Sequence, residues 1–401
     1  MGTSSLGLQS AASGLLACIH GQEDLSLYIH LPFCGKRCGY CAFYSEEMPA
    51  WQARIQPYLD RLEKEIIMAR NAYGKPFETI FVGGGNPGNL TVAQLAHLLR
   101  SAGPSKETTF EINPESFTEK HLDLFSSGLA NRLSMGIQSM DNATLSLLGR
   151  HARRNDNLRA LRLACQLPTD CRLSFDLMEG LPGQTPEGAK ADIDEVVDIA
   201  HPTHLSLYCL TLEEGTRLTA QVRGHELSVP DDDQMADNLG QLWQYLASKG
   251  FHQYEVSNFA KEGAACFHNQ RYWRLQPYLG LGCSAASTLR EKSGNLLRLT
   301  VRQQLPEYLE GAAFSGFELE ELDRKKEAEE YLLVKLRTAE GIDRKQFKER
   351  FGFSFSDLLE RAAYINPSWY TEGKNTFSLT REGLLVSDAV ILTLALALDR
   401  I

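Results

Sequence analysis

The sequence predicts an α/β fold, a partial TIM-like (β/α)6 barrel followed by a small, mostly helical C-terminal domain. Between residues 25 and 210, short β-rich runs alternate with longer segments of helical periodicity, the pattern of a parallel sheet covered by helices. The predicted strands span residues 25–31, 79–84, 108–113, 132–137, 172–178 and 204–210. Helical spacing of apolar residues is found over 51–71, 92–101 and 189–200. In barrels of this kind the functional groups lie at the carboxyl ends of the strands.

Four segments are predicted along the chain. Residues 1–24 are expected to be a disordered leader, because the first 22 contain no Lys, Arg, Asp or Glu. Residues 25–215 form the barrel core. Residues 216–318 are an extension that closes or decorates the barrel, with a helix over 232–249 and an irregular, aromatic stretch over 254–289. The charged run 318–330 opens a helical C-terminal domain over 319–401, for which a winged-helix-like form is one expectation.

Composition excludes several classes of protein. The 401 residues contain 41 basic and 51 acidic side chains, a net charge of −10 without a long basic run, which argues against a nucleic-acid surface. The longest apolar run, 389–398, is about half of the ~20 residues that a membrane helix needs. Nine cysteines are too few and too unevenly spaced for a disulfide scaffold. We therefore expect a soluble, cytoplasmic protein.

Three cysteines crowd into eight residues directly after the first predicted strand. Cys34, Cys38 and Cys41 have the spacing C-x3-C-x2-C. Three thiolates can hold three irons of a [4Fe–4S] cubane and leave the fourth iron open, whereas structural zinc and ordinary ferredoxin clusters usually have four protein ligands. The alternative is a structural zinc site that borrows a distant fourth ligand. The candidates for that ligand are Cys266, His268 and Cys283.

The segment around these cysteines resembles a known family. Residues 28–34 (YIHLPFC), continuing to 43–45 (FYS), are similar to the cluster loop of the radical S-adenosylmethionine (SAM) group that contains the coproporphyrinogen-III dehydrogenases and the HemW-type heme chaperones. The resemblance runs in order over roughly residues 25–290. It implies a radical SAM barrel with SAM bound at the open iron. It also implies that Tyr28 and Tyr40 line the cluster and SAM, and that Phe43 packs near the adenine.

A glycine-rich segment follows the second predicted strand. Residues 83–87 (GGGNP) resemble the GGGTP segment of this family, which approaches the methionyl end of SAM. Glycines let backbone N–H and C=O groups reach a ligand that side chains would block. The resemblance implies that Gly84, Gly85 and Asn86 lie beside SAM, with Asn86 standing where the family usually has Thr.

Polar residues occupy the ends of the next three predicted strands. Glu111, Gln138 and Asp176 interrupt apolar strands, which is costly unless each finds a partner, so they indicate a polar ligand. The resemblance assigns them, together with Arg150, to the SAM pocket, with Arg150 as a partner for the SAM carboxylate. The alternative is a set of internal salt bridges across the barrel mouth.

Residues 266–273 (CFHNQRYW) contain the pattern H-N-x-x-Y-W. Histidine is a normal axial ligand of heme iron, and a Tyr-Trp pair offers flat apolar surface for the macrocycle. The pattern resembles the motif that marks HemW proteins and is associated there with heme. It implies that His268, Tyr272 and Trp273 bind heme; the alternative is a structural histidine beside aromatic residues.

Two departures separate this chain from the dehydrogenases. They carry a further cysteine two residues after the third ligand, where this chain has Phe43, and a long extension before the first strand, where this chain has about 24 residues. Both favour a heme chaperone that delivers heme to target hemoproteins. The expected partners are heme, acceptor proteins, an electron donor such as flavodoxin or ferredoxin, and a second copy of the chain.

Three alternatives to the heme chaperone stay open. The first two are enzymes: an oxygen-independent coproporphyrinogen III dehydrogenase and a HemW-like radical SAM methyltransferase. The third is a structural metal module that binds no SAM. Beyond the cluster itself, no catalytic residue is assigned.

Overall fold

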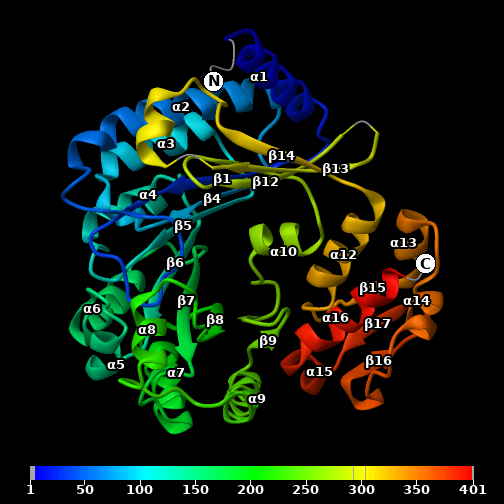
Figure 1. Ribbon diagram of the computed structural model, residues 1–401. Helices are drawn as coiled ribbons and strands as arrows, with labels where there is room; N and C mark the ends of the chain where they lie inside the picture. The colour runs from blue at the N-terminus through cyan, green and yellow to red at the C-terminus, as the bar shows by residue number, and fades with distance from the viewer. Residues whose placement is uncertain (1–4, 292, 303, 400–401) are drawn as a thin grey trace.

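The computed structural model describes residues 5–291, 293–302 and 304–399. Its centre is a twelve-stranded sheet in the order β14-β13-β12-β11-β1-β4-β5-β6-β7-β8-β10-β9. Six consecutive parallel strands form the middle of this sheet: β1 (Ser26–Leu31), β4 (Thr79–Gly84), β5 (Glu107–Ile112), β6 (Arg132–Gln138), β7 (Arg172–Glu179) and β8 (His204–Cys209). Figure 1 shows them as an arc with helices on its outer side. The predicted α/β barrel is confirmed, and each predicted strand matches an observed strand.

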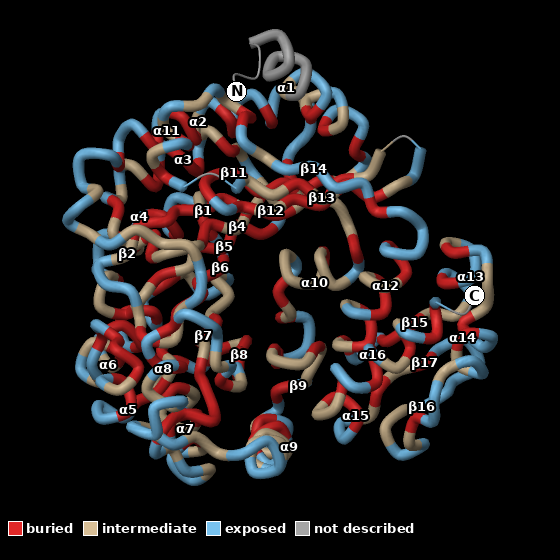
Figure 2. Tube along the Cα trace, in the orientation of Figure 1, coloured by how far each residue is buried: buried red, intermediate tan, exposed pale blue. Residues whose placement is uncertain are grey.

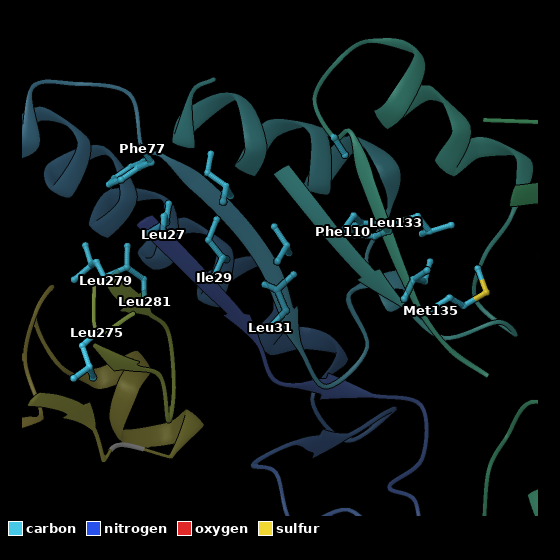
Figure 3. Packing of buried hydrophobic residues seen from close by; sticks show 14 of the residues in the cluster. Leu27, Ile29, Leu31, Phe77, Phe110, Leu133, Met135, Leu275, Leu279 and Leu281 are labelled. Atoms are coloured by element: carbon cyan, nitrogen blue, oxygen red, sulfur yellow. The ribbon is translucent and has the colours of Figure 1, made fainter. Parts of the chain in front are cut away.

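The helices after each strand cover the convex face of the sheet. They are α2 (Ile55–Tyr73), α3 (Val92–Ala102), α4 (Leu122–Ser126), α5 (Asn142–Leu147), α6 (Arg154–Ala164) and α7 (Pro186–Ala200), with α8 (Arg217–Arg223) and α9 (Asp232–Ser248) after β8. Side chains alternate along a strand, so Leu27, Ile29 and Leu31 pack into the buried core (Figure 3). Tyr28 and His30 consequently face the concave side, where the polar residues of neighbouring strands also point.

The segment after β8 extends both edges of the sheet. At one edge β11 (Tyr278–Leu281) pairs in parallel with β1, and β12 (Ala286–Arg290), β13 (Leu296–Val301) and β14 (Phe317–Leu322) follow in antiparallel order. At the other edge β10 (Asn258–Ala260) pairs with β8, and β9 (His252–Gln253) pairs with β10. The short helix α10 (Phe267–Trp273) connects the two edges, and α11 (Leu305–Glu310) lies between β13 and β14.

The boundary expected at residues 318/319 is wrong, because it falls inside β14. The run Glu318–Glu321 was expected to open a helical domain, but it pairs with β13 as the outermost strand of the sheet. Charged side chains are common on such edge strands, where they prevent pairing with other chains. The helical character begins only at α12 (Arg324–Lys335).

The C-terminal part is mostly helical, as predicted. After α12 it contains α13 (Arg344–Phe351), α14 (Phe355–Arg361), α15 (Arg381–Leu385) and α16 (Ser387–Leu398). A small antiparallel sheet in the order β15 (Ile342–Asp343), β17 (Thr376–Leu379), β16 (Tyr370–Glu372) joins these helices. Figure 2 shows buried residues along the strands of the large sheet and on the inward faces of these C-terminal helices.

The expectation of a disordered leader is wrong for the described residues. The chain forms α1 (Ser5–His20), which lies beside α2 in Figure 1; residues 1–4 lie outside the described part. Ile19 is fully buried, and the Gln22 side chain donates to the carbonyl oxygen of Arg290 at 2.7 Å. Leu15 and Ile19, four residues apart, bury one face of the helix. The lack of charge therefore marks a docked helix.

No helix within the described residues is both long enough and apolar enough to cross a membrane.

Candidate functional site

A cavity of about 610 Å³ opens at the carboxyl ends of the parallel strands. We call it the cluster cavity. The structure brings eleven of the predicted site residues together in its lining: Cys34, Cys38, Tyr40, Cys41, Phe43, Gly84, Gly85, Glu111, Gln138, Arg150 and Asp176. Phe43 lies at the rim, with 75% of its surface exposed. The cavity therefore combines the thiols, the glycines and the polar strand ends that the sequence singled out separately.

The loop that carries the three cysteines is clamped through Gly39. The Gly39 N–H donates to the carbonyl oxygen of Leu148 at 2.8 Å, and its own carbonyl accepts from the N–H of Leu218 at 2.8 Å. The guanidinium of Arg217 packs over this point, since a Cβ on Gly39 would lie 3.1 Å from its Nη2. A second glycine, Gly149, has φ +68° and also lies against Arg217. A side chain at Gly149 would be strained by the positive φ and would crowd the guanidinium, and one at Gly39 would lie 3.3 Å from the carbonyl oxygen of Leu148.

A small apolar core packs beneath the contacts that hold Gly39 in place. Tyr40 packs against it between the second and third cysteines of the loop. The buried members of this core are Leu148, Met178, Leu181, Leu210 and Leu218. The position of the cysteines is thus set by contacts with segments more than 100 residues away in the chain.

Two of the three thiols are poor thiolates in the absence of a bound metal. Burial raises the pKa of Cys34 to about 11 and also raises the pKa of Cys41. Metal ligation requires the thiolate, so a bound cation would supply the missing stabilisation. Within the described residues, no three His, Cys, Asp or Glu side chains converge on one point as ligands of a single ion do. Ligands on separate irons of a cubane have no such requirement.

Two half-buried carboxyl groups, those of Glu111 and Asp176, line the cluster cavity. Burial, with a smaller contribution from Asp176, raises the pKa of Glu111 to about 8, and burial raises the pKa of Asp176 to about 6. Oδ1 of Asp176 is buried without a hydrogen-bond partner in the described part of the chain. Neither carboxyl group lies within salt-bridge distance of Arg150 or of another described cation. The alternative of internal salt bridges across the barrel mouth is therefore not what the structure contains.

Gln138 reaches the cavity through an irregularity in the sheet. The register of β6 against β7 shifts between Gly136 and Gln138, and Gln138 has a φ of +66°. Few residues other than glycine adopt this conformation, and such residues cluster at functional sites. Gly136 makes room for the turned side chain, because a Cβ there would lie 2.7 Å from Nε2 of Gln138.

The glycines at the carboxyl end of β4 allow close packing against the cysteine loop. A Cβ on Gly84 (φ +119°) would lie 2.8 Å from Cε1 of His30, and one on Gly85 would lie 3.0 Å from Sγ of Cys34. Asn86 behaves differently from the expectation. It is 2% exposed and does not line the cavity; its Oδ1 accepts from the N–H groups of Gly88 and Asn113, both at 3.2 Å. Asn86 therefore holds the loop in place from beneath.

A second cavity has a volume of about 240 Å³. We call it the aromatic cavity. Its lining consists of Tyr28, Phe81, His268, Asn269, Tyr272 and Tyr278. Tyr28 thus faces this cavity and not the cluster cavity, and its hydroxyl is hydrogen-bonded to Nδ1 of His30 at 3.0 Å. Tyr28 and Phe81 are paired neighbours on β1 and β4, so both strands contribute to its wall.

His268 is held in one orientation on α10. Its Nδ1 lies 2.8 Å from the Thr79 hydroxyl, and its ring centroid lies 5.2 Å from that of Phe81. Burial, together with the nearby Arg271 and Arg132, lowers the pKa of His268 to about 3, so the ring is neutral at physiological pH. Because Nδ1 is occupied, Nε2 is the nitrogen left for a ligand. Trp273 is not part of the lining and packs against Tyr272 with centroids 4.7 Å apart.

Sequence reasoning missed Thr79 and Glu107, which position the histidine. Oε1 of Glu107 accepts from the backbone N–H of His268 at 3.0 Å and from the thiol of Cys266 at 3.5 Å. Arg172 pairs with the same carboxylate at 3.1 Å. Both residues are polar positions at the amino ends of buried strands, the same signal that identified Glu111 at a carboxyl end. Their role could not be predicted because it depends on contacts with α10, which is distant in sequence.

The two cavities lie toward opposite ends of the parallel strands. Thr79 begins β4 beside His268, whereas Gly84 ends it beside the cysteine loop, about 16 Å away at ~3.3 Å per residue. Cys266 and His268 are therefore too far from the loop to complete a zinc site. Cys283 is fully buried, its N–H donates to the Tyr58 hydroxyl at 3.2 Å, and it does not line the cluster cavity. None of the three suggested fourth ligands supports the zinc alternative.

Comparison with known proteins agrees with this geometry. Residues 28–196 match the radical SAM superfamily, and residues 322–386 match the HemN C-terminal domain. The E. coli coproporphyrinogen III oxidase HemN has the same fold, with a TM-score of 0.77, 23% identity and coverage of 96% of this chain and 93% of that one. The chain is a radical SAM protein, a class that implies a [4Fe–4S] cluster and SAM.

Relatives of similar length identify the family within the radical SAM proteins to which this chain belongs. The chain is 32% identical over 381 residues to the heme chaperone HemW of Escherichia coli, covering 92% of this chain and 97% of the relative. It is 30% identical to HemW of Haemophilus influenzae over 373 residues, covering 90% and 95%. It is also 30% identical to HemW of Bacillus subtilis over 387 residues, covering 91% and 97%. This chain belongs to the HemW heme chaperone family.

Proposed function

We propose that this protein binds heme in the aromatic cavity and delivers it to acceptor hemoproteins, while a [4Fe–4S] cluster and SAM occupy the cluster cavity. The observation that carries the heme assignment is the fixed, neutral His268, whose Nδ1 is held by Thr79. Neutral imidazole with one nitrogen hydrogen-bonded and the other free is the form that ligates iron.

The cluster assignment rests on the chemistry of the donor set. Cys34, Cys38 and Cys41 are half-buried thiols on one clamped loop. Burial raises the pKa of Cys34 and Cys41, so bound iron would relieve the cost of forming these two thiolates. With SAM on the open iron, the cluster would supply one electron to cleave the sulfonium–carbon bond. Gly84 and Gly85 would let the methionyl end of SAM approach the backbone.

The polar side chains that line the cluster cavity suit a cationic ligand such as SAM. Asp176 has an unpartnered buried oxygen, Glu111 lies beside it, and Gln138 is turned toward the same space. A buried acceptor without a partner costs roughly 1–3 kcal/mol, which a ligand donor would recover. Arg150 and Tyr40 close the side of the cavity next to the cysteines.

The aromatic cavity would hold one part of a heme. Its volume of about 240 Å³ is below the ~300–1,000 Å³ of ordinary ligand pockets, so the remainder of the macrocycle would project from it. Tyr28, Phe81, Tyr272 and Tyr278 offer ring faces, and Trp273 supports Tyr272 from behind. A partly enclosed heme suits transfer to another protein.

A hemin titration tests the proposal. The full chain, reconstituted anaerobically, is titrated with hemin while the Soret band is recorded, beside the same titration of His268→Ala and of His97→Ala. His97 is an exposed histidine on α3, so its variant should match the wild type. His268→Ala should shift the Soret band and release hemin more readily. An unchanged spectrum and affinity in His268→Ala would remove this residue from the heme site.

A parallel assay distinguishes the chaperone from an enzyme. The same preparation is given reductant, SAM and coproporphyrinogen III, and the mixture is analysed for 5′-deoxyadenosine and protoporphyrinogen. Hemin binding without protoporphyrinogen formation supports the chaperone. Formation of protoporphyrinogen would establish the dehydrogenase instead.

The proposal includes three further features of the working protein. A small one-electron carrier such as flavodoxin or ferredoxin would reduce the cluster. None of the nine cysteines forms a disulfide, which suits the reducing environment of the cytoplasm. A homodimer is expected to form, and the elution volume of the loaded protein would measure it.

A further inference from the structure

Arg150 contacts a thiol of the cysteine loop directly. Its Nη1 donates to Sγ of Cys38 at 3.7 Å, and its side chain belongs to a residue that is only 6% exposed. The resemblance to the family implied a different role for Arg150, as a partner for the SAM carboxylate. A positive charge buried beside a cluster ligand affects the energy of adding an electron to the cluster.

The guanidinium is held in place from its other side. Nη2 donates to the carbonyl oxygen of Gly136 at 2.6 Å and to Oδ1 of Asn113 at 3.2 Å. The Arg150 backbone N–H donates to the carbonyl oxygen of Leu145 at 2.9 Å, next to the Leu148 contact that clamps the cysteine loop. The thiol and the cation are therefore fixed to one framework, and their contact does not depend on a mobile side chain.

No carboxylate neutralises this cation at close range. Within the residues described, Arg150 takes part in no salt bridge, and its Nε is buried without a partner. Its charge is thus available to Cys38 through Nη1.

We propose that Arg150 raises the reduction potential of the cluster through its N–H···S hydrogen bond to Cys38. Reduction adds an electron to the cluster, and hydrogen bonds to the cluster sulfurs together with nearby positive charge stabilise the more negative state. Arg150 acts through Cys38 and is therefore a tuning residue. This inference rests on the proposed assignment of Cys38 as a cluster ligand and is independent of heme.

The test measures the midpoint potential of the cluster without SAM. The full chain is reconstituted anaerobically and titrated with a low-potential reductant while the signal of the reduced cluster is followed by electron paramagnetic resonance. Arg150→Gln should lower the equilibrium constant for one-electron reduction about tenfold, which corresponds to a midpoint lower by about 59 mV. A midpoint equal to the wild type would overturn the proposal, even if SAM binding were weakened.

Two further variants keep the result interpretable. Arg154→Gln removes a cation at the start of α6 that pairs with Glu195 on α7, and it should leave the midpoint unchanged. An equal shift in Arg154→Gln would show a general charge effect and overturn the proposal. If the Arg150→Gln variant lost its iron, the Arg150→Lys variant would be measured in its place. Lysine keeps the positive charge but lacks the forked geometry of the guanidinium, so the midpoint potential should still fall. A wild-type midpoint in Arg150→Lys would equally overturn it.

Cluster formation in the wild-type protein distinguishes a failure of this inference from a failure of the proposed function. If the wild-type protein formed no four-iron cluster, the proposed function would fail before any variant was measured. If it formed the cluster and the potentials did not differ, only the role of Arg150 would fail.

Discussion

The hydroxyl of Thr79 lies 2.8 Å from Nδ1 of His268 and so ties the first residue of β4 to a helix almost 190 residues later. The contact fixes the ring of the histidine and leaves Nε2 as the nitrogen for a ligand. Glu107, on the adjacent strand, accepts the backbone N–H of the same residue. The candidate heme ligand is thus positioned by the sheet, and this positioning can be tested separately from the ligand itself.

Thr79→Val should weaken hemin binding while leaving the fold intact. Valine has nearly the shape of threonine but cannot bond Nδ1, so the ring would lose its preferred orientation. Loss of such a supporting bond typically costs about 10–100-fold in affinity at metal sites. Hemin titration would measure the change. Thr371→Val, on the exposed strand β16, is the control, and equal affinity in both variants would contradict the role of Thr79.

Cys38→Ala should abolish the iron–sulfur absorption near ~400 nm after anaerobic reconstitution. Two thiolates would remain, too few to hold a cubane with one open iron. Iron analysis and the visible spectrum would report the loss. Cys165→Ala, which removes an exposed thiol at the end of α6, should retain both colour and iron. Retention of the cluster in Cys38→Ala would count against the ligand assignment.

SAM binding should release a proton from Glu111. Its pKa of about 8 means that the carboxyl group is about 90% protonated at pH 7 and about 10% protonated at pH 9. The positive charge of SAM favours the carboxylate, so SAM affinity should rise between pH 7 and pH 9. Calorimetry in buffers of different ionisation enthalpy would count the protons.

Glu111→Gln gives the comparison for this measurement. The variant should release about 0.9 fewer protons per SAM at pH 7, with the difference nearly gone at pH 9. Asp176, with a pKa of about 6, is largely ionised throughout this range and would not produce the effect. Identical proton release in the wild type and Glu111→Gln would exclude Glu111 from the site.

Gly149→Ala should destabilise the cysteine loop. The new Cβ would lie 2.5 Å from Nη2 of Arg217 and 3.2 Å from the backbone nitrogen of Gly39, and the residue has φ +68°. We expect a loss of about 1–3 kcal/mol and lower iron content. Gly128→Ala is a matched control, because Gly128 has φ +71° with nothing within 4 Å. Urea unfolding should show a smaller loss there and no change in iron.

Ile19→Ala should lower stability by about 2–5 kcal/mol, the usual cost of emptying a filled core position. Ser13→Ala, on the exposed side of the same helix, should have little effect. Chemical unfolding of both variants would measure the difference. Equal stability of the two would mean that α1 does not contribute to the core.

Local patterns in the sequence determined the parallel strands and the chemistry at their carboxyl ends. Alternation along each strand distinguishes buried from inward-facing positions, so Glu111, Gln138 and Asp176 could be identified one strand at a time. The spacing of Cys34, Cys38 and Cys41 is equally local. Because parallel strands bring their carboxyl ends to one edge, a common site followed from the order of the elements alone.

Only the tertiary structure decided which residues meet across the chain. The docking of α1, the pairing of β14 with β13, the place of Tyr28 in the aromatic cavity and the buried bonds of Asn86 all depend on distant segments. The same holds for Arg150 with Cys38 and for Thr79 with His268. The periodicity of a segment indicates which way each side chain faces on its own helix or strand. The residue that this side chain contacts is set by how elements that are remote in sequence pack together.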